Sequence, residues 1–443
     1  MKIFKRLLCA AVCAALSISL FGCVMTVDQM YVPPRRSESY RNLQAVMDEV
    51  MAGMEYCAPI TGENQQTVQM ADLNGDGLKE VVVFVRANDE QPLKILIFKL
   101  KNGEYTPMSL LESAGSAFDQ VEYIQLDGRP GLEMVVGRQV SDQVLRNLTV
   151  YSFSGGQPEQ LLTVNYQKFL ILDMNEDNRG DLFVLHPGRT DTDCGLVELY
   201  SAPDGEVVRS AEVKLSQSVD QLKRIMTGSL HGGEKAVFVA STVDAGTIIT
   251  DVYALVNGKL TNVSMSSDSG TSVKTVRNYY VYAEDIDGDG VLELPSLIPM
   301  RWPQESRTME EREHLIRWYS LGADGSEHDK RFTYHNYLQG WYMVLDEKLV
   351  SRTCVIPEDT GRFAFCLWDK KYENLQKLWT VYVLTGEDRS NVAVEDGRFI
   401  LYKTDSVVYA ACLEGAGRDA GITQENLINS FFLIQSDWKT GEM

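Results

Sequence analysis

Asp72-Leu73-Asn74-Gly75-Asp76-Gly77-Leu78-Lys79-Glu80 and its near copy Asp285-Ile286-Asp287-Gly288-Asp289-Gly290-Val291-Leu292-Glu293 decide how this sequence is interpreted. In both stretches, carboxylate or amide oxygens fall at positions 1, 3, 5 and 9, and position 6 is a glycine that allows a tight bend. Calcium prefers a cage of hard oxygen ligands of this kind. We therefore predict that each stretch is a calcium-binding loop, with the carbonyl at position 7 as a further ligand.

Residues 173–181 form a third copy with the same polar positions. Asn178 replaces the glycine in this copy, and asparagine tolerates the positive φ of that position. The predicted metal ligands of the three loops are Asp72, Asn74, Asp76, Leu78 (carbonyl), Glu80, Asp173, Asn175, Asp177, Arg179 (carbonyl), Asp181, Asp285, Asp287, Asp289, Val291 (carbonyl) and Glu293. An EF-hand is excluded because position 12 carries no carboxylate, whereas an acidic turn without an ion remains the alternative.

Two further copies have lost part of the ligand set. Residues 125–133 carry Arg129 at position 5, and we expect its guanidinium to replace the metal and to pair with Asp127 or Glu133. Residues 226–234 keep only Glu234 and are predicted to be metal-free. We refer to the five copies in chain order as the first to the fifth loop.

The five loops start 53, 48, 53 and 59 residues apart, and an apolar run such as Val81–Val85 follows each of them. A period of about 50 residues with about four short strands is typical of β-propeller blades. The sequence therefore predicts a mainly β fold with a five-bladed propeller over residues 60–336. A seven-bladed propeller is the alternative if the C-terminal part adds two degenerate blades.

An acidic loop followed by an apolar strand resembles the FG-GAP/VCBS repeat of integrin-α-like propellers, over about residues 60–335. The resemblance implies that calcium binds between the first two strands of a blade. The glycine-alanine-proline triplet of some of these repeats is missing here.

Residues 1–22 have the form of a signal peptide, with Lys2, Lys5 and Arg6 before an apolar run. Leu20-Phe21-Gly22-Cys23 resembles the lipobox of bacterial lipoproteins, which implies a lipid on Cys23 and an extracytoplasmic, membrane-anchored protein. An ordinary secretory signal is the alternative. Residues 23–59 are predicted to form a tether and an amphipathic helix, whose methionine-rich face either packs on the next domain or binds a partner.

Residues 337–443 are predicted to form an α+β domain with five strands and a final helix at about residues 424–432, for which Thr423 is the N-cap. The fifth blade carries a long excursion over residues 295–335, with a helix predicted near residues 309–317. Its aromatic residues Trp302, Trp318 and Tyr319 either form a ligand platform or anchor the excursion.

The formal net charge of −20 argues against nucleic acid as a partner. No HExxH, GxSxG or Walker pattern is present. The five cysteines after Cys23 are scattered, and we expect free thiols, although Cys354 and Cys366 could pair across a hairpin. The sequence favours a calcium-stabilised surface module that binds a glycan, peptide or protein. A polysaccharide hydrolase and a structural subunit of an envelope complex are the alternatives.

Overall fold

The computed structural model describes residues 38–140, 146–188, 193–244, 246–279, 281–300, 314–368 and 375–435. The described chain is mainly β, as predicted, and its strands form six antiparallel sheets of four or five strands. Within each of the first four sheets, consecutive strands are hydrogen-bonded neighbours, with β1 as an extra strand beside β3. This order matches the predicted unit of strand, loop and three further strands.

The strand bounds follow chain order. The first sheet contains β1 (Glu55–Tyr56), β2 (Val68–Ala71), β3 (Glu80–Arg86), β4 (Leu93–Lys101) and β5 (Glu104–Ser113). The second contains β6 (Ala117–Ile124), β7 (Glu133–Gln139), β8 (Arg146–Ser152) and β9 (Glu159–Tyr166). The third contains β10 (Lys168–Leu172), β11 (Asp181–His186), β12 (Leu196–Ser201) and β13 (Val208–Lys214). The fourth contains β14 (Leu222–Ser229), β15 (Lys235–Asp244), β16 (Thr247–Val256) and β17 (Lys259–Asn262).

The last two sheets are less regular. The fifth contains β18 (Leu294–Pro299), β19 (His314–Leu321), β20 (Glu327–Asn336), β21 (Trp341–Leu345) and the distant β27 (Phe431–Leu433). The sixth contains β22 (Thr353–Asp359), β23 (Arg362–Leu367), β24 (Gln376–Leu384), β26 (Val408–Leu413) and β25 (Arg398–Lys403), in that spatial order. The α-helices are α3 (Glu38–Val50), α4 (Glu347–Val350), α5 (Arg389–Val392), α6 (Gly415–Asp419) and α7 (Gln424–Ser430), and the two short 3₁₀ turns are η1 (Val219–Gln221) and η2 (Val273–Thr275).

The apolar runs after the loops are strands buried on both faces. In β3, Val82 and Phe84 pack toward the second sheet, whereas the alternate residues Val81, Val83 and Val85 pack toward α3. In a strand, successive side chains point to opposite faces, so a continuous apolar run serves two neighbours at once. This is why the runs predicted the strands well.

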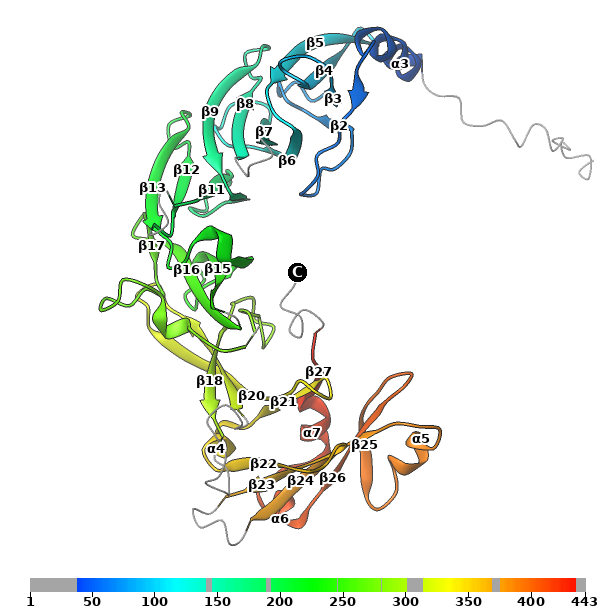
Figure 1. Ribbon diagram of the computed structural model, residues 1–443, viewed down its shortest axis with the longest axis vertical. Helices are drawn as coiled ribbons and strands as arrows, with labels where there is room; N and C mark the ends of the chain where they lie inside the picture. Colours follow the sequence, from blue (N-terminus) through cyan, green and yellow to red (C-terminus); the bar gives the residue numbers. More distant parts are fainter. Residues whose placement is uncertain are drawn as a thin grey trace, which may run out of the picture.

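The sheets stack face to face along an open arc (Figure 1). One apolar cluster joins each pair of successive sheets from the first to the fifth. In Figure 1 the first and fifth sheets lie at opposite ends of the arc, so the described chain does not show the closed ring of a propeller.

Both end faces of the arc are covered by other elements. Leu43 and Met47 of α3 pack on the outer face of the first sheet. On the fifth sheet, Leu315 and Trp341 belong to one apolar cluster with Phe365 of the sixth sheet. The ends of a stacked array expose apolar surface unless something covers them. The helix and the sixth sheet supply these covers. The methionine-rich face of α3 therefore packs on the next domain, which confirms that interpretation over partner binding.

Two predicted elements are corrected. Trp341–Leu345 was assigned to the C-terminal domain, but as β21 it pairs with β20 in the fifth sheet. The helix predicted near residues 309–317 is also wrong over its last residues, because His314–Leu321 is strand β19 between β18 and β20. Burial between two strands outweighs the local preference of a charged segment for helix. Residues 309–313 of that helix lie outside the described chain.

The C-terminal helix is confirmed as α7, with Thr423 as its N-cap in a reciprocal capping box with Asn426. Strand β22 was not predicted. The strand order of the sixth sheet is not sequential, and α6 contacts its strand β24, so this part does not repeat the pattern of the first four sheets. Cys354 and Cys366 lie opposite each other on β22 and β23 as free, buried thiols.

Candidate functional site

The acidic loops lie where the sequence places them, each at the start of a second strand. The first three connect β2 to β3, β6 to β7 and β10 to β11, and the fifth leads into β18 after a bridge between Glu284 and Glu293. In the first loop, Asp72 accepts hydrogen bonds from the backbone N–H groups of Gly75 (2.8 Å) and Gly77 (3.0 Å). The position-1 carboxylate therefore builds the turn even without an ion.

The carboxylate at position 9 has a structural role that the sequence analysis did not foresee. Glu80, Glu133, Asp181 and Glu293 are all buried, and each accepts a hydrogen bond from the N–H of position 2 in its own loop, at 2.8 to 3.1 Å. Burial, followed by the nearby loop carboxylates, raises the pKa of Asp181 to about 6 and that of Glu293 to about 7. These acids close the loop onto the next strand.

The fifth loop has the arrangement best suited to a cation. Within the described residues, Asp285, Asp287 and Asp289 form the one group of three acidic side chains whose ligand atoms all lie within 4.8 Å of one another. Oδ1 of Asp287 and Oε1 of Glu293 are buried and have no hydrogen-bond partner among the described residues. A buried carboxylate oxygen without a donor is costly, and a bound cation would remove that cost. This donor set of carboxylates fits calcium.

The fifth loop is not free of positive charge. Lys330 of β20 forms an ion pair with Asp289 at 2.5 Å, and its side chain is 18% exposed. Hydrogen bonding to Asp289 raises the pKa of Lys330, and Asp287 and Glu293 add to that effect. The ammonium group is thus paired with one of the carboxylates that would hold a metal.

The first loop is more fully satisfied. Nδ2 of Asn74 donates to Oε1 of Glu80 at 2.8 Å, so the oxygen that has no partner in the fifth loop has one here. Leu78 and Val291, the predicted carbonyl ligands, occupy equivalent places, since their N–H groups donate to the position-5 carboxylates of Asp76 (2.8 Å) and Asp289 (2.9 Å).

In the third loop a guanidinium lies among the predicted ligands. Arg179 donates to Oδ2 of Asp177 through Nη2 (2.7 Å) and Nε (3.1 Å), and through Nη1 to the Ala202 carbonyl (2.8 Å). Partial burial opposes ionisation of Asp177, but the bonds from Arg179 outweigh it and lower the pKa of that carboxyl. Asn178 adopts a φ of 63°, as predicted.

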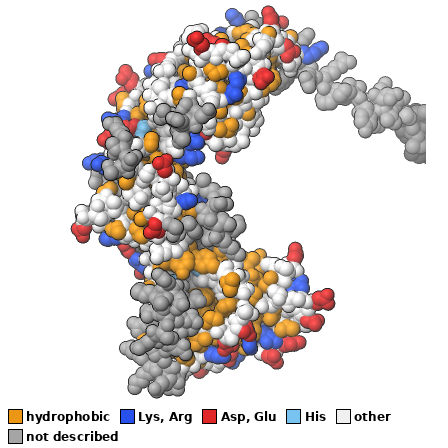
Figure 2. Space-filling view, viewed as in Figure 1, with side chains coloured by type: hydrophobic (Ala, Val, Ile, Leu, Met, Phe, Trp, Pro, Cys, Tyr) orange, Lys and Arg blue, Asp and Glu red, His pale blue; other side chains and the backbone are white. Residues whose placement is uncertain are grey.

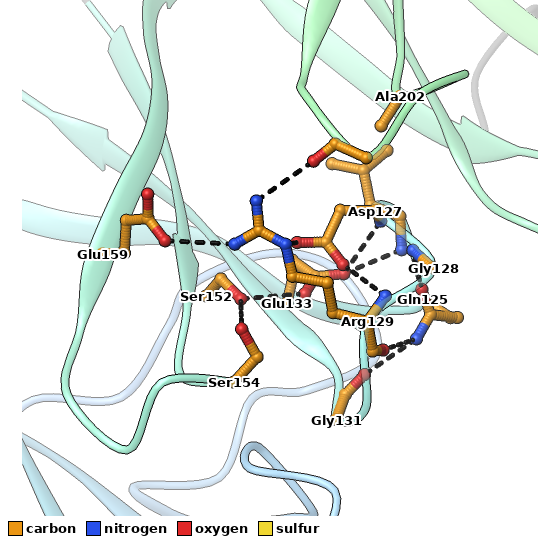
Figure 3. Close-up of polar contacts among 12 residues, drawn as sticks. Gln125, Asp127, Gly128, Arg129, Gly131, Glu133, Ser152, Ser154, Glu159 and Ala202 are labelled. Atoms are coloured by element: carbon orange, nitrogen blue, oxygen red, sulfur yellow. Dashed lines mark hydrogen bonds and ion pairs between the residues drawn. The ribbon is translucent and has the colours of Figure 1, made fainter.

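In the second loop, Arg129 takes the position predicted for a metal substitute (Figure 3). Its Nε lies 3.5 Å from Oδ2 of Asp127, and Nη1 lies 3.2 Å from Glu159. Nη2 donates to the carbonyl of Gly205 at 3.3 Å, which belongs to the third sheet's β12–β13 turn. Arg129 therefore pairs with Asp127 rather than Glu133, and it also links two sheets.

The fourth loop is shorter than predicted. Met226 and Ser229 belong to β14, and β15 begins at Lys235, so only residues 230–234 remain between the strands. Glu234 is the one predicted acid there, and its buried Oε2 has no hydrogen-bond partner among the residues that the structure describes. A turn this short has no room for the nine-residue cage.

Neighbouring loops touch through their backbones. Leu132 N–H of the second loop donates to the Asp72 carbonyl at 2.9 Å, and Gly180 N–H of the third donates to the Gln125 carbonyl at 2.8 Å. A Cβ on Gly131, which has a φ of 99°, would lie 2.3 Å from the Leu73 carbonyl oxygen. Glycine is required where two backbones approach this closely. The loops thus form part of the contact between sheets, and an ion held in one would act on that contact.

Of the two interpretations of the aromatic residues, the burial of Trp318 and Tyr319 favours the anchor over the ligand platform. Trp318 is 0% exposed and donates its indole N–H to Thr333, and Tyr319 is 2% exposed beneath Arg317. Both side chains anchor the fifth sheet. Trp302 lies outside the described residues, as does Cys23.

A different group of rings from the same region lines a half-open pocket of about 340 Å³, between the fifth sheet and the β22–β23 turn. Its ring-bearing residues are Tyr279, His314, Tyr334, His335, Tyr337 and Phe363. Tyr279 and Tyr337 stack with centroids 5.6 Å apart, and the Tyr337 hydroxyl is buried with no hydrogen-bond partner within the described ranges. Leu338 at the rim is 88% exposed. Hydrophobic side chains also reach the surface around the junction of these two sheets in Figure 2.

Comparison with known proteins leaves the family open. No family description and no curated protein matches this sequence. Among solved structures, the similar ones include Sqt1 from Saccharomyces cerevisiae, with 9% identity and a TM-score of 0.28, covering 71% of this chain and 84% of that one. A Bacillus licheniformis rhamnogalacturonan lyase has 13% identity and a TM-score of 0.31, covering 76% of this chain and 70% of the lyase. A Lactobacillus plantarum protein has 10% identity and a TM-score of 0.26, covering 72% of this chain and 86% of that one.

Within the described residues, no helix is long and apolar enough to cross a membrane.

Proposed function

We propose that this protein is a lipid-anchored, extracytoplasmic binding module, built from propeller-type repeats of the FG-GAP/VCBS kind and stabilised by calcium. The observation that supports calcium most directly is the pair of buried, unpartnered oxygens on Asp287 and Glu293 beside Asp285 and Asp289. Four carboxylates without enough donors form a site that a divalent cation completes. The role of the ion is structural in this proposal, because its ligands join the loop to the start of β18.

The ligand of the module is proposed to bind in the ring-lined pocket at the junction of the fifth and sixth sheets. Leu297 of β18 lines this pocket, and β18 begins directly after Glu293 of the calcium loop. Aromatic faces pack on the C–H face of a sugar ring, while Asn336, Asp359 and Thr360 offer polar groups to its hydroxyls. A pyranose unit of an envelope glycan is therefore the ligand that the lining favours.

The glycan proposal predicts that substitutions of Tyr337 weaken glycan binding, and that the larger truncation weakens it more. The mature chain with calcium is screened on a glycan array, and each hit is titrated with variants. Tyr337→Ala should weaken binding at least tenfold because a ring wall is lost, and Tyr337→Phe about fivefold, corresponding to about 1 kcal/mol for one hydrogen bond. Tyr402→Ala is the matched control, since Tyr402 is 46% exposed on β25. Absence of any glycan hit, or equal affinity of the Tyr337→Ala variant, would contradict the proposal.

The anchor is tested separately. In a bacterial host, the full chain should sediment with membranes and Cys23→Ser should move it to the soluble fraction, because a diacylated cysteine is the attachment. Cys57→Ser is the control that keeps the lipid site, and it should stay with the membranes. Retention of Cys23→Ser in the membrane fraction would exclude this form of attachment.

A further inference from the structure

Lys330 lies outside the fifth loop in sequence but forms an ion pair with one of its carboxylates. It comes from β20, 41 residues beyond Asp289 in the chain, and its Nζ lies 2.5 Å from Oδ2 of that carboxylate. Lys330 therefore lies beside the position that a cation bound to Asp285, Asp287 and Asp289 would take.

Cations supplied by the chain itself recur in these loops. Arg129 is paired with Asp127 in the second loop, and Arg179 is paired with Asp177 in the third. Each arginine is part of its own loop and also donates to a backbone carbonyl of the third sheet's β12–β13 turn, Arg179 to Ala202 and Arg129 to Gly205. Lys330 is different, because an ammonium group on a flexible four-carbon stem can move away when a stronger cation arrives.

We propose that Lys330 is a tethered cation that competes with calcium for the carboxylates of the fifth loop and thereby sets the calcium affinity of that loop. This inference rests on the proposed calcium site. In the ion-free protein the ammonium offsets part of the repulsion among the carboxylates. When calcium binds, the divalent ion repels the ammonium group of Lys330, and Lys330 must leave Asp289 for solvent. The competition weakens binding, so that calcium at the higher concentrations found outside cells is needed to fill the site.

The test is calorimetric titration of calcium into the chelator-cleared mature protein at about 0.1 M KCl, where screening is fixed. Lys330→Met should bind calcium at least tenfold more tightly than the unchanged protein, because the competing charge is gone. Lys330→Arg keeps the charge and should bind no more tightly than the unchanged protein. Lys377→Met, which removes another ion-paired lysine on β24, is the matched control and should not alter the affinity.

A second readout separates competition from a merely structural contact. In chelator, Lys330→Met should melt at a lower temperature than the unchanged protein, since its carboxylates lose their counter-charge, and its gain on calcium addition should be larger. Equal calcium affinity of the unchanged protein and Lys330→Met would overturn the inference while leaving the calcium site intact. Absence of calcium binding in both proteins would overturn the calcium site and this inference together.

Discussion

Saturating calcium is expected to raise the melting temperature of the chelator-treated protein by roughly 3 °C. An ion that binds only the folded state stabilises it by about 2.7 kcal/mol at a hundred times its Kd, and in a chain of 443 residues the entropy of unfolding makes 1 kcal/mol correspond to about 1 °C. Glu293 and Asp287 contribute most of this gain, because in the part of the chain that the structure describes their buried oxygens have no hydrogen-bond partner. Thermal melts in calcium and in chelator measure it directly.

Asp287→Asn is the variant that isolates the site. In the first loop the equivalent Asn74 donates to Glu80, so an asparagine at 287 should donate to Glu293 and stabilise the ion-free protein. The same change removes one ligand charge and should reduce the gain from calcium. Asp285→Ala is less informative, because Asp285 also accepts N–H groups of the turn, at 2.7 to 3.0 Å, with or without metal.

Asp204→Asn provides the matched control, since this exposed aspartate lies outside the loops, in the β12–β13 turn, and should leave both melting temperatures unchanged. A calcium gain that is the same in Asp287→Asn and in the unchanged protein would remove the fifth loop as the site. No gain in any of these proteins would mean that the acidic loops are turns without an ion.

Trp341→Ala is expected to cost about 3–5 kcal/mol of unfolding free energy, the usual range for removing a buried Trp. Trp341 is 0% exposed, and its ring centroid lies 5.6 Å from Phe431, 5.7 Å from Phe363 and 5.6 Å from Tyr334. These partners come from β27, β23 and β20, so the loss should loosen the sixth sheet from the fifth. Urea unfolding followed by circular dichroism measures the change.

Trp341→Phe is the control for this prediction. The indole N–H of Trp341 has no hydrogen-bond partner in the described chain, so a smaller ring removes contact area without breaking a described hydrogen bond. We expect it to cost less than half as much as the alanine variant, because it leaves a smaller cavity. A loss below about 1 kcal/mol for Trp341→Ala would show that the sixth sheet holds to the fifth by other contacts.

Much of the fold followed from two local patterns in the sequence. The apolar runs after the acidic loops predicted strands such as β3 and β11, since both faces of these strands are buried. The spacing of Leu43 and Met47 predicted α3. Closure of a ring could not be derived in this way, because it depends on the rotation between packed sheets. Strand β27 was also hidden, since it pairs with β21 almost 90 residues earlier in the chain.

At the candidate site, too, residues within one loop could be predicted from the sequence, whereas a contact from a distant strand could not. Loop spacing predicted the acidic positions, and Arg129 was visible as a metal substitute because it lies within its loop. Lys330 could not be linked to Asp289 from sequence, since only the packing of β20 brings it there. The sequence left open whether Trp318 is a platform or an anchor residue, because a single aromatic residue carries no signal of the face on which it lies, and its burial favours the anchor.

The covered ends of the arc change what limits the size of the molecule. A ring fixes the number of its members, since the angles between them must add up to a full turn. An array that ends in a helix on one side and a different sheet on the other has no such sum to satisfy. Each inner sheet packs only on the sheet before it and the sheet after it. One such sheet could therefore be added or removed without changing the packing at the ends. A chain of this architecture is therefore free to gain or lose an inner sheet, and with it to lengthen or shorten the arc, without redesigning either end.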